Sequence, residues 1–305
     1  MSHIFFVIED RAAEVEAGET ILQAALRAAI PHAHACGGNA RCSTCRVQVI
    51  EGLDCCAPRT ERELELAARL HFSSEIRLAC QTTIRGDVKL RRLVLDAEDI
   101  KLTAQSTDAP APIGEEKRLA ILFADIRGFT PFAERLLPYD VVHVLNRYYY
   151  EVGRAITAHD GHIDNYMGDG LLALFGVDNT RDAARQAVGA ALGMIAAVER
   201  LKPYVEMIYG KSFEIGIGIH YGEVIVGAIG APGMKRVTVI GDAVNLASRI
   251  ESATKRVGAR LLISEAAFAE LQGAIIPGPA HRIRLAGKSG EYLLYEVSGL
   301  NEGSE

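Results

Sequence analysis

Four of the six cysteines have a spacing that suits iron ligation. Cys36, Cys42 and Cys45 come from one short segment with two glycines, and Cys80 comes from a distant part of the chain. Three thiolates from one loop and a fourth from elsewhere are typical of a 2Fe-2S cluster. Structural zinc usually shows two Cys-x-x-Cys pairs or histidine ligands and is less favoured. Disulfides, which are rare in cytosolic chains, are less favoured still.

Two aspartates beyond the cysteines follow apolar runs. Asp125 lies in FADIRGFT (123–130), where an acid, a glycine and a helix start come in succession. A carboxylate there can bind a divalent cation, while the N–H groups of 127–130 face phosphate oxygens. Asp169 lies in NYMGDGLLALFG (165–176), at the expected tip of a hairpin. Two acids on adjacent turns predict a two-metal clamp.

A third motif, VTVIGDAVNLASRIES, carries Asn245 and Arg249. Residues four apart share one face of a helix, so the amide and the guanidinium can act together. A guanidinium matches phosphate oxygens whose charge grows in a transition state, and the amide can orient a ribose oxygen or the transferred phosphate.

The sequence around the cysteines predicts several strands and two helices, which must position the cysteines. Apolar alternation predicts strands at 4–8 and 13–18, 46–50, 76–79 and 88–94. Thr20 is the expected cap of a helix that runs to Pro31, and a second helix is expected at 60–70. Residues 99–116 lose this periodicity and carry prolines, which predicts a linker.

The part of the chain after the expected linker alternates strands and helices. We expect a strand at 119–125, helices from Thr130-Pro131 to His159, and two strands around Asp169. A helix at 181–200, strands on either side of Tyr221-Gly222, a strand at 236–240 and a helix at 243–257 follow.

Composition narrows the class of protein. The chain has 305 residues, 49% of them apolar, which is enough for two domains with buried cores. Its net charge of -6 makes nucleic acid a poor expected partner. The longest apolar stretch, near 188–198, is about half of the ~20 residues that a bilayer requires, and the N-terminus lacks a signal-peptide pattern. We therefore expect a cytoplasmic protein without a membrane span.

The first module resembles the 2Fe-2S ferredoxins, on the cysteine spacing and on RLACQ around Cys80. The resemblance implies a β-grasp fold with Cys36, Cys42, Cys45 and Cys80 as ligands. Cys55 and Cys56 fall outside the pattern, and we expect ordinary thiols there. His32 and His34, beside a complete set of four thiolates, are expected to be surface residues.

FADIRGFT, NYMGDGLLALFG and VIGDAVNLASRIES occur in this order, and together they resemble the class III adenylate and guanylate cyclases. The resemblance implies a ferredoxin-like βαββαβ core that is active as a homodimer. Asp125 and Asp169 match the metal-binding aspartates for two Mg²⁺ or Mn²⁺ ions, with the carbonyl of Ile126 as a further ligand. Asn245 and Arg249 match the catalytic pair that the partner protomer supplies. Gly128, Phe129 and Thr130 are expected to bind substrate phosphates.

Two positions depart from the family pattern. The base-selecting position four residues before Asp169 is commonly lysine in adenylate cyclases and glutamate in guanylate cyclases, but here it is Asn165. The other base-selecting position is Thr238, which resembles the bacterial subgroup that uses ATP. In LAGKSGEY the first of two phosphate-binding lysines is Ala286, so the contact is expected from Lys288.

These features predict an α+β protein with a ferredoxin domain (1–98), a linker (99–116), a cyclase domain (117–299) and a tail (300–305). The expected activity is conversion of ATP to cyclic AMP and pyrophosphate, modulated by the redox state or occupancy of the cluster, with a redox partner possible. The alternatives are a guanylate cyclase, or an electron-transfer ferredoxin whose cyclase-like domain is catalytically silent.

Overall fold

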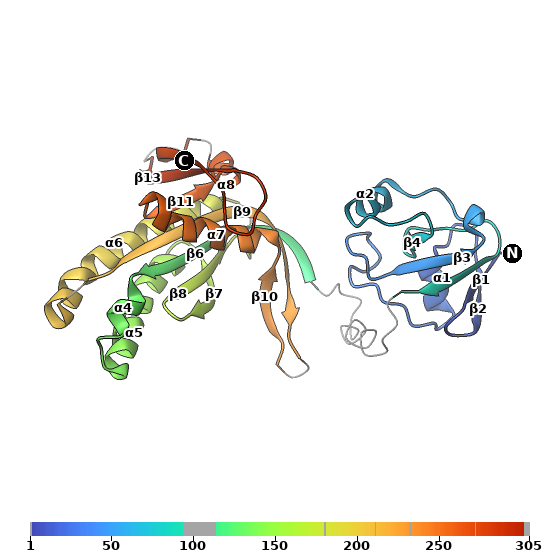
Figure 1. Ribbon diagram of the computed structural model, residues 1–305, viewed down its shortest axis with the longest axis horizontal. Coiled ribbons are helices and arrows are strands. Elements are labelled where there is room, and N and C mark those ends of the chain that lie inside the picture. The colour runs from blue at the N-terminus through green and yellow to red at the C-terminus, as the bar shows by residue number, and fades with distance from the viewer. Residues whose placement is uncertain are drawn as a thin grey trace. The chain divides into compact units, whose positions relative to one another are not determined.

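The computed structural model describes residues 2–93, 114–179, 181–210, 212–231, 234–271 and 273–301. The chain divides into two compact units, residues 1–115 and 116–305 (Figure 1). The expected linker lies outside the described residues as far as position 113, and residues 114–116 already belong to a strand. Among the described helices, none has the length and apolar character needed to cross a membrane.

The first unit is built on a five-stranded mixed sheet. Its strands lie in the order β2-β1-β5-β3-β4, and only β1 and β5 are parallel. Thr20 caps α1 through a capping box with Gln23, which fixes the start of the helix where the sequence predicts it. The apolar face of α1 packs on the sheet and forms the core of a β-grasp unit. The elements are β1 (Ser2–Phe6), β2 (Arg11–Val15), α1 (Ile21–Arg27), β3 (Arg46–Glu51), η1 (Leu53–Cys55), α2 (Glu61–Arg69), β4 (Ile76–Leu78) and β5 (Val88–Arg92).

The second unit contains an eight-stranded sheet. Strands β9-β6-β8-β7 lie side by side, and with α5 and α6 they form the expected βαββαβ core. In Figure 1, β10 and the end of β9 form a hairpin that extends from the rest of this unit. The elements are β6 (Gly114–Arg127), α4 (Phe129–Ala133), α5 (Pro138–Thr157), β7 (His162–Met167), β8 (Gly170–Phe175), α6 (Ala183–Tyr209), β9 (Glu214–Ile229), β10 (Arg236–Ile240), α7 (Asp242–Val257), β11 (Leu261–Ser264), α8 (Glu265–Leu271), β12 (Ile275–Ile283) and β13 (Tyr292–Leu300).

Strand β6 is covered on both faces, which explains its near-continuous apolar sequence. Ala120, Leu122 and Ala124 pack into the large core with α5 and α6. Leu119 and Ile121 point the other way, into the core that includes the start of α7. Successive side chains of a strand alternate between faces, so one short run can anchor helices on both sides of the sheet.

One expected helix and two expected strands differ in the structure. Helix α6 continues past residue 200 and through Pro203 to Tyr209, because Leu201 and Val205 stay buried on either side of the proline. The two strands expected around Tyr221-Gly222 are one continuous strand, β9. Gly222 serves close packing there and not a turn, since a Cβ on it would lie 3.0 Å from the Cβ of Ala243 on α7.

Candidate functional site

The four cysteines of the predicted cluster form two pairs in the first unit. The sulfur of Cys45 lies 3.5 Å from that of Cys80. The thiols of Cys36 and Cys42 interact with each other, which lowers the pKa of Cys36 and raises the pKa of Cys42. Two thiolates on each of two irons is the arrangement that a 2Fe-2S cluster takes, so these residues fit the group.

The loop that carries Cys36 and Cys42 also supplies hydrogen-bond donors to the sulfurs. Gly37 and Gly38 have φ values of 69° and 86°, in the left-handed region that glycine adopts readily. Backbone N–H groups of the loop reach Cys36, and the Thr44 hydroxyl lies 3.1 Å from the Cys42 sulfur. Such donors stabilise electron-rich sulfurs and tune the potential of a cluster.

The expectation of a surface residue is wrong for His32, whose side chain is 4% exposed. Its Nε2 lies 3.4 Å from the carbonyl oxygen of Cys45, and burial lowers its pKa to about 4. The ring therefore packs behind the cysteine loop as a neutral group. His34 is part-buried, and its Nδ1 lies 2.7 Å from the carbonyl oxygen of His32. Cys55 and Cys56 are half-buried free thiols, in line with ordinary cysteines.

In the second unit, strand pairing brings the two predicted acids together. Asp125 lies on β6 and Asp169 in the turn between β7 and β8, and β6 pairs with β8 directly beside both. Burial raises the pKa of Asp169 to about 6, and the negative charge of Asp125 adds to this effect. A cation relieves the repulsion between two half-buried carboxylates of like charge, so the pair fits divalent metal ions.

Two residues near the acids were not predicted from the sequence. The ammonium of Lys255 lies 2.9 Å from Oδ2 of Asp125. Glu251, four residues earlier on α7, is 7% exposed, and its Oε1 has no hydrogen-bond partner among the described residues. Burial raises the pKa of Glu251 to about 7, with Asp125 as the next cause. The i, i+4 spacing of the two side chains on a predicted helix was the available signal.

The predicted base-selecting residues lie on two strands that do not pair with each other, Asn165 on β7 and Thr238 on β10. Arg236 donates from Nη1 to Oδ1 of Asn165 at 3.0 Å. Thr238 donates from its hydroxyl to Oδ2 of Asp164 at 2.9 Å. The structure therefore brings the predicted pair together through two residues that the motifs did not indicate.

The remaining predicted residues are more dispersed. Asn245 and Arg249 share an exposed face of α7, and their side chains have no hydrogen bond to any other described residue. Lys288 is paired with Asp242 at the start of the same helix. Ile126 is buried in the core.

The expected helix start at Thr130-Pro131 is wrong by two residues. Helix α4 begins at Phe129, and Gly128 caps it with a φ of 68°, in the left-handed region. Thr130 and Pro131 therefore lie inside this five-residue helix.

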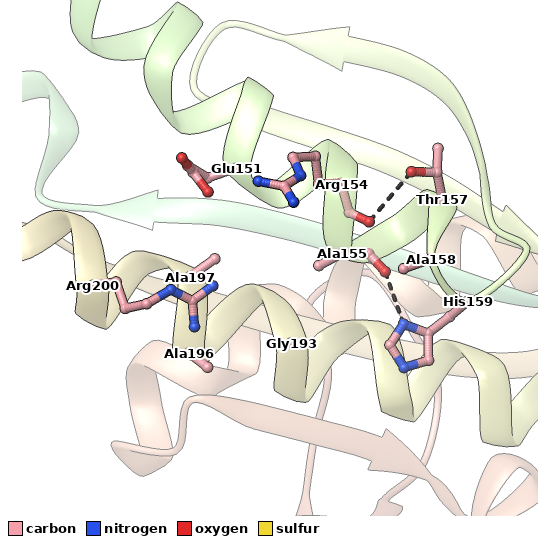
Figure 2. Close-up of a pocket in the computed structure, with 10 residues that line it drawn as sticks. All are labelled: Glu151, Arg154, Ala155, Thr157, Ala158, His159, Gly193, Ala196, Ala197 and Arg200. Atoms are coloured by element: carbon pink, nitrogen blue, oxygen red, sulfur yellow. Dashed lines mark hydrogen bonds between the residues drawn. The ribbon is translucent and has the colours of Figure 1, made fainter.

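A separate cleft of about 520 Å³ lies between α5 and α6. Figure 2 shows Arg154 from α5, His159 from the turn just after α5, and Arg200 from α6 around it. The His159 ring packs close to α6 because a glycine, Gly189, faces it. The guanidinium of Arg200 has no ion pair or hydrogen bond within the described residues, and none of the predicted site residues lines this cleft.

Known proteins match both units. Residues 112–297 match the family described as adenylate and guanylate cyclase catalytic domain, and residues 6–85 match the 2Fe-2S iron-sulfur cluster binding domain. An adenylate cyclase of Anabaena cylindrica is 39% identical over 57% of this chain and 33% of its own length. Adenylate cyclase 1 of Rhizobium meliloti is 31% identical over 78% of this chain and 37% of its own length. The chain thus spans little more than a third of these relatives.

Solved structures agree with the family of the second unit. The guanylyl cyclase Cya2 covers 62% of this chain and 95% of its own, with a TM-score of 0.59 and 34% identity. The adenylyl cyclase CyaB from P. aeruginosa covers 61% of this chain and 96% of its own, with a TM-score of 0.54 and 31% identity. The chain belongs to the class III adenylate and guanylate cyclase family, and a 2Fe-2S cluster binding domain precedes its catalytic domain.

Proposed function

We propose that this chain converts ATP to 3′,5′-cyclic AMP and pyrophosphate at the interface of a homodimer. The observation that carries the proposal is the pair of half-buried carboxylates, Asp125 and Asp169, which strand pairing holds side by side. The working parts are the ferredoxin domain at 1–98 and the cyclase domain at 117–299.

Each residue has one task in the proposed reaction. Asp125 and Asp169, with the carbonyl of Ile126, hold two divalent cations, Mg²⁺ or Mn²⁺. When bound, these cations supply Lewis acidity toward the ribose 3′-hydroxyl and the α-phosphate. Arg249 stabilises charge on the transferred phosphoryl group, and Asn245 orients the ribose oxygen. No protein nucleophile is required.

The terminal phosphates are assigned to other residues of the site. Lys288 donates to them from the loop before β13, after release from Asp242. The N–H groups at Gly128, Phe129 and Thr130 face the phosphates from the start of α4.

The test of activity is an assay with Mn²⁺ and each nucleoside triphosphate, in which cyclic product is identified by mass. Asp125→Ala should abolish the product while the visible absorbance of the cluster stays unchanged. Glu270→Ala, which removes an exposed acid on α8, is the matched control and should retain activity. A wild-type protein that holds the cluster but cyclises no triphosphate would instead favour an electron-transfer protein with a silent cyclase-like domain.

The homodimer can be tested by mixing two inactive variants. In the proposal, Asp125 of one protomer works with Arg249 of its partner. Mixed dimers of Asp125→Ala and Arg249→Ala then contain one intact site, so the mixture should recover about a quarter of wild-type activity. No recovery after verified exchange of protomers would contradict a site shared between two copies.

We further propose that the cluster modulates the cyclase, since its charge changes by one on reduction and both units belong to one chain. Anaerobic rates at two defined potentials, with Cys36→Ser as a variant without the cluster, test this point. One unchanged rate in the oxidised, reduced and cluster-free proteins would refute modulation and leave the cyclase activity intact.

A further inference from the structure

Each side chain at the two base-selecting positions already makes one hydrogen bond within its own protomer. The guanidinium of Arg236 donates to Oδ1 of Asn165 at 3.0 Å. The hydroxyl of Thr238 donates to the carboxylate of Asp164 at 2.9 Å. Both bonds join β7 to β10, so they also hold the two positions beside each other.

These bonds determine what the two side chains can offer to a ligand. A guanidinium has only donors, so Asn165 must turn its carbonyl oxygen toward Arg236 and its NH₂ group away. A carboxylate is an acceptor, so the proton of Thr238 is committed to Asp164 and only lone pairs remain. Asn165 is left as a donor, and Thr238 is left as an acceptor.

We propose that Arg236 and Asp164 are positioning residues that fix this polarity and thereby select adenine. The proposal rests on the proposed function, in which Asn165 and Thr238 face the Watson–Crick edge of the base. Adenine offers an amino donor at position 6 and an acceptor at N1, whereas guanine offers an acceptor at position 6 and a donor at N1. With position 6 at Thr238 and N1 at Asn165, adenine makes two hydrogen bonds. In the same placement, the oxygen at position 6 of guanine would face the lone pairs of Thr238, and its N1–H would face the NH₂ group of Asn165, so neither hydrogen bond could form.

The two positioning residues differ in burial. Asp164 is 8% exposed, so its bond to Thr238 lies in a largely dry site and is costly to break. Arg236 is exposed and comes from β10, in the extended hairpin. Its charge also lies beside the neutral Asn165, at the position where cyclases that use ATP commonly carry lysine. Arg236 is therefore the residue whose removal frees the amide to rotate without opening the core.

The experiment compares kcat/KM for ATP, GTP and inosine triphosphate in the full-length protein with Mn²⁺. The base of inosine triphosphate has the same donors and acceptors as guanine at positions 1 and 6 but lacks the 2-amino group. It therefore separates the effect of the hydrogen-bonding pattern from the steric effect of the 2-amino group. The wild type should prefer ATP over both. Arg236→Ala should reduce the preference for ATP over inosine triphosphate about tenfold, mainly through KM, because one fixed hydrogen bond is lost. Arg236→Lys keeps a donor and should restore most of the preference, and Arg200→Ala in the α5–α6 cleft is the charge-matched control.

Three results would overturn the inference. They are a wild type that prefers GTP or inosine triphosphate, an unchanged preference in Arg236→Ala, and equal losses with all three nucleotides, which a purely structural role would give. If no triphosphate is cyclised by the wild type, the proposed function fails. Equilibrium binding of ATP and inosine triphosphate with Ca²⁺ to the same variants then tests the polarity by itself.

Discussion

The ion pair between Lys255 and Asp125 gives a sharp prediction about metal binding. A divalent cation that binds Asp125 must displace or repel the ammonium, which lies 2.9 Å from Oδ2. Replacing Lys255 by glutamine removes the competing charge and leaves both carboxylates in place. We therefore expect Lys255→Gln to bind Mn²⁺ more tightly than the wild type.

The size of the effect follows from the exposure of the pair. The side chains of Lys255 and Asp125 are 49% and 30% exposed, so water screens much of their attraction. Ion pairs of this kind contribute about 0.3–1 kcal/mol. The dissociation constant for Mn²⁺ should accordingly fall about two- to fivefold, since ~1.4 kcal/mol corresponds to a factor of ten.

Electron paramagnetic resonance of free Mn²⁺, titrated without nucleotide at low ionic strength, measures this constant directly. Lys255→Arg keeps the charge and should resemble the wild type. Lys202→Gln makes the same change of net charge on α6, where the lysine pairs with Glu199 and Glu214, and should also resemble the wild type. Weaker binding by Lys255→Gln, or equal tightening by Lys202→Gln, would refute the reasoning.

Three further predictions concern stability. Glu63→Ala leaves the Arg77 guanidinium buried without its carboxylate, which lies 2.9 Å away, and should cost about 3–5 kcal/mol in urea unfolding followed by cluster absorbance. Glu51→Ala breaks only the exposed pair with Lys89 and should cost less than ~1 kcal/mol; equal losses would contradict the role of burial. Gly218→Ala places a Cβ 2.1 Å from the backbone nitrogen of Glu251 and should destabilise the second unit by about 1–3 kcal/mol in thermal unfolding. Gly153→Ala is the control and should be tolerated, because its Cβ would lie 3.6 Å from the nearest atom, Cδ1 of Ile163. Burial lowers the pKa of His220 to about 4, below the ~6.5 of an unfolded chain, so its contribution is complete above pH 6.5 and is lost as the pH falls toward 4. His220→Gln should flatten this decline of the unfolding midpoint, and an unchanged acid limb would contradict it.

Local sequence signals predicted most elements because the deciding interactions are themselves local. Thr20 and Gln23 are three residues apart, and their capping box sets the start of α1. Gly222 is the opposite case. It follows Tyr221 in a pattern typical of a turn, but in the structure β9 continues through it and Ala243 of α7 packs against it. That requirement comes from packing between distant segments, which local propensity does not encode.

The same distinction separates the predicted site residues from their neighbours. Motifs indicated Asp125 and Asn165, but their partners come from far along the chain. Lys255 is 130 positions from Asp125, and Arg236 is 71 positions from Asn165. Both partners are exposed cations that look like ordinary surface residues in the sequence. Only the fold places one cation against a predicted metal ligand and the other against a predicted base-selecting amide.

The positions of residues along helix α7 support the proposal that two copies of the chain share each site. Lys255, near its C-terminal end, contacts Asp125 of its own protomer. Asn245 lies ten residues earlier on this helix, about 15 Å along its axis, and Arg249 lies six residues earlier, about 9 Å away. An asparagine side chain cannot span such a distance, and both side chains are exposed and have no hydrogen bond to other described residues. If Asn245 is to work with an acid pair, that pair must belong to a second copy.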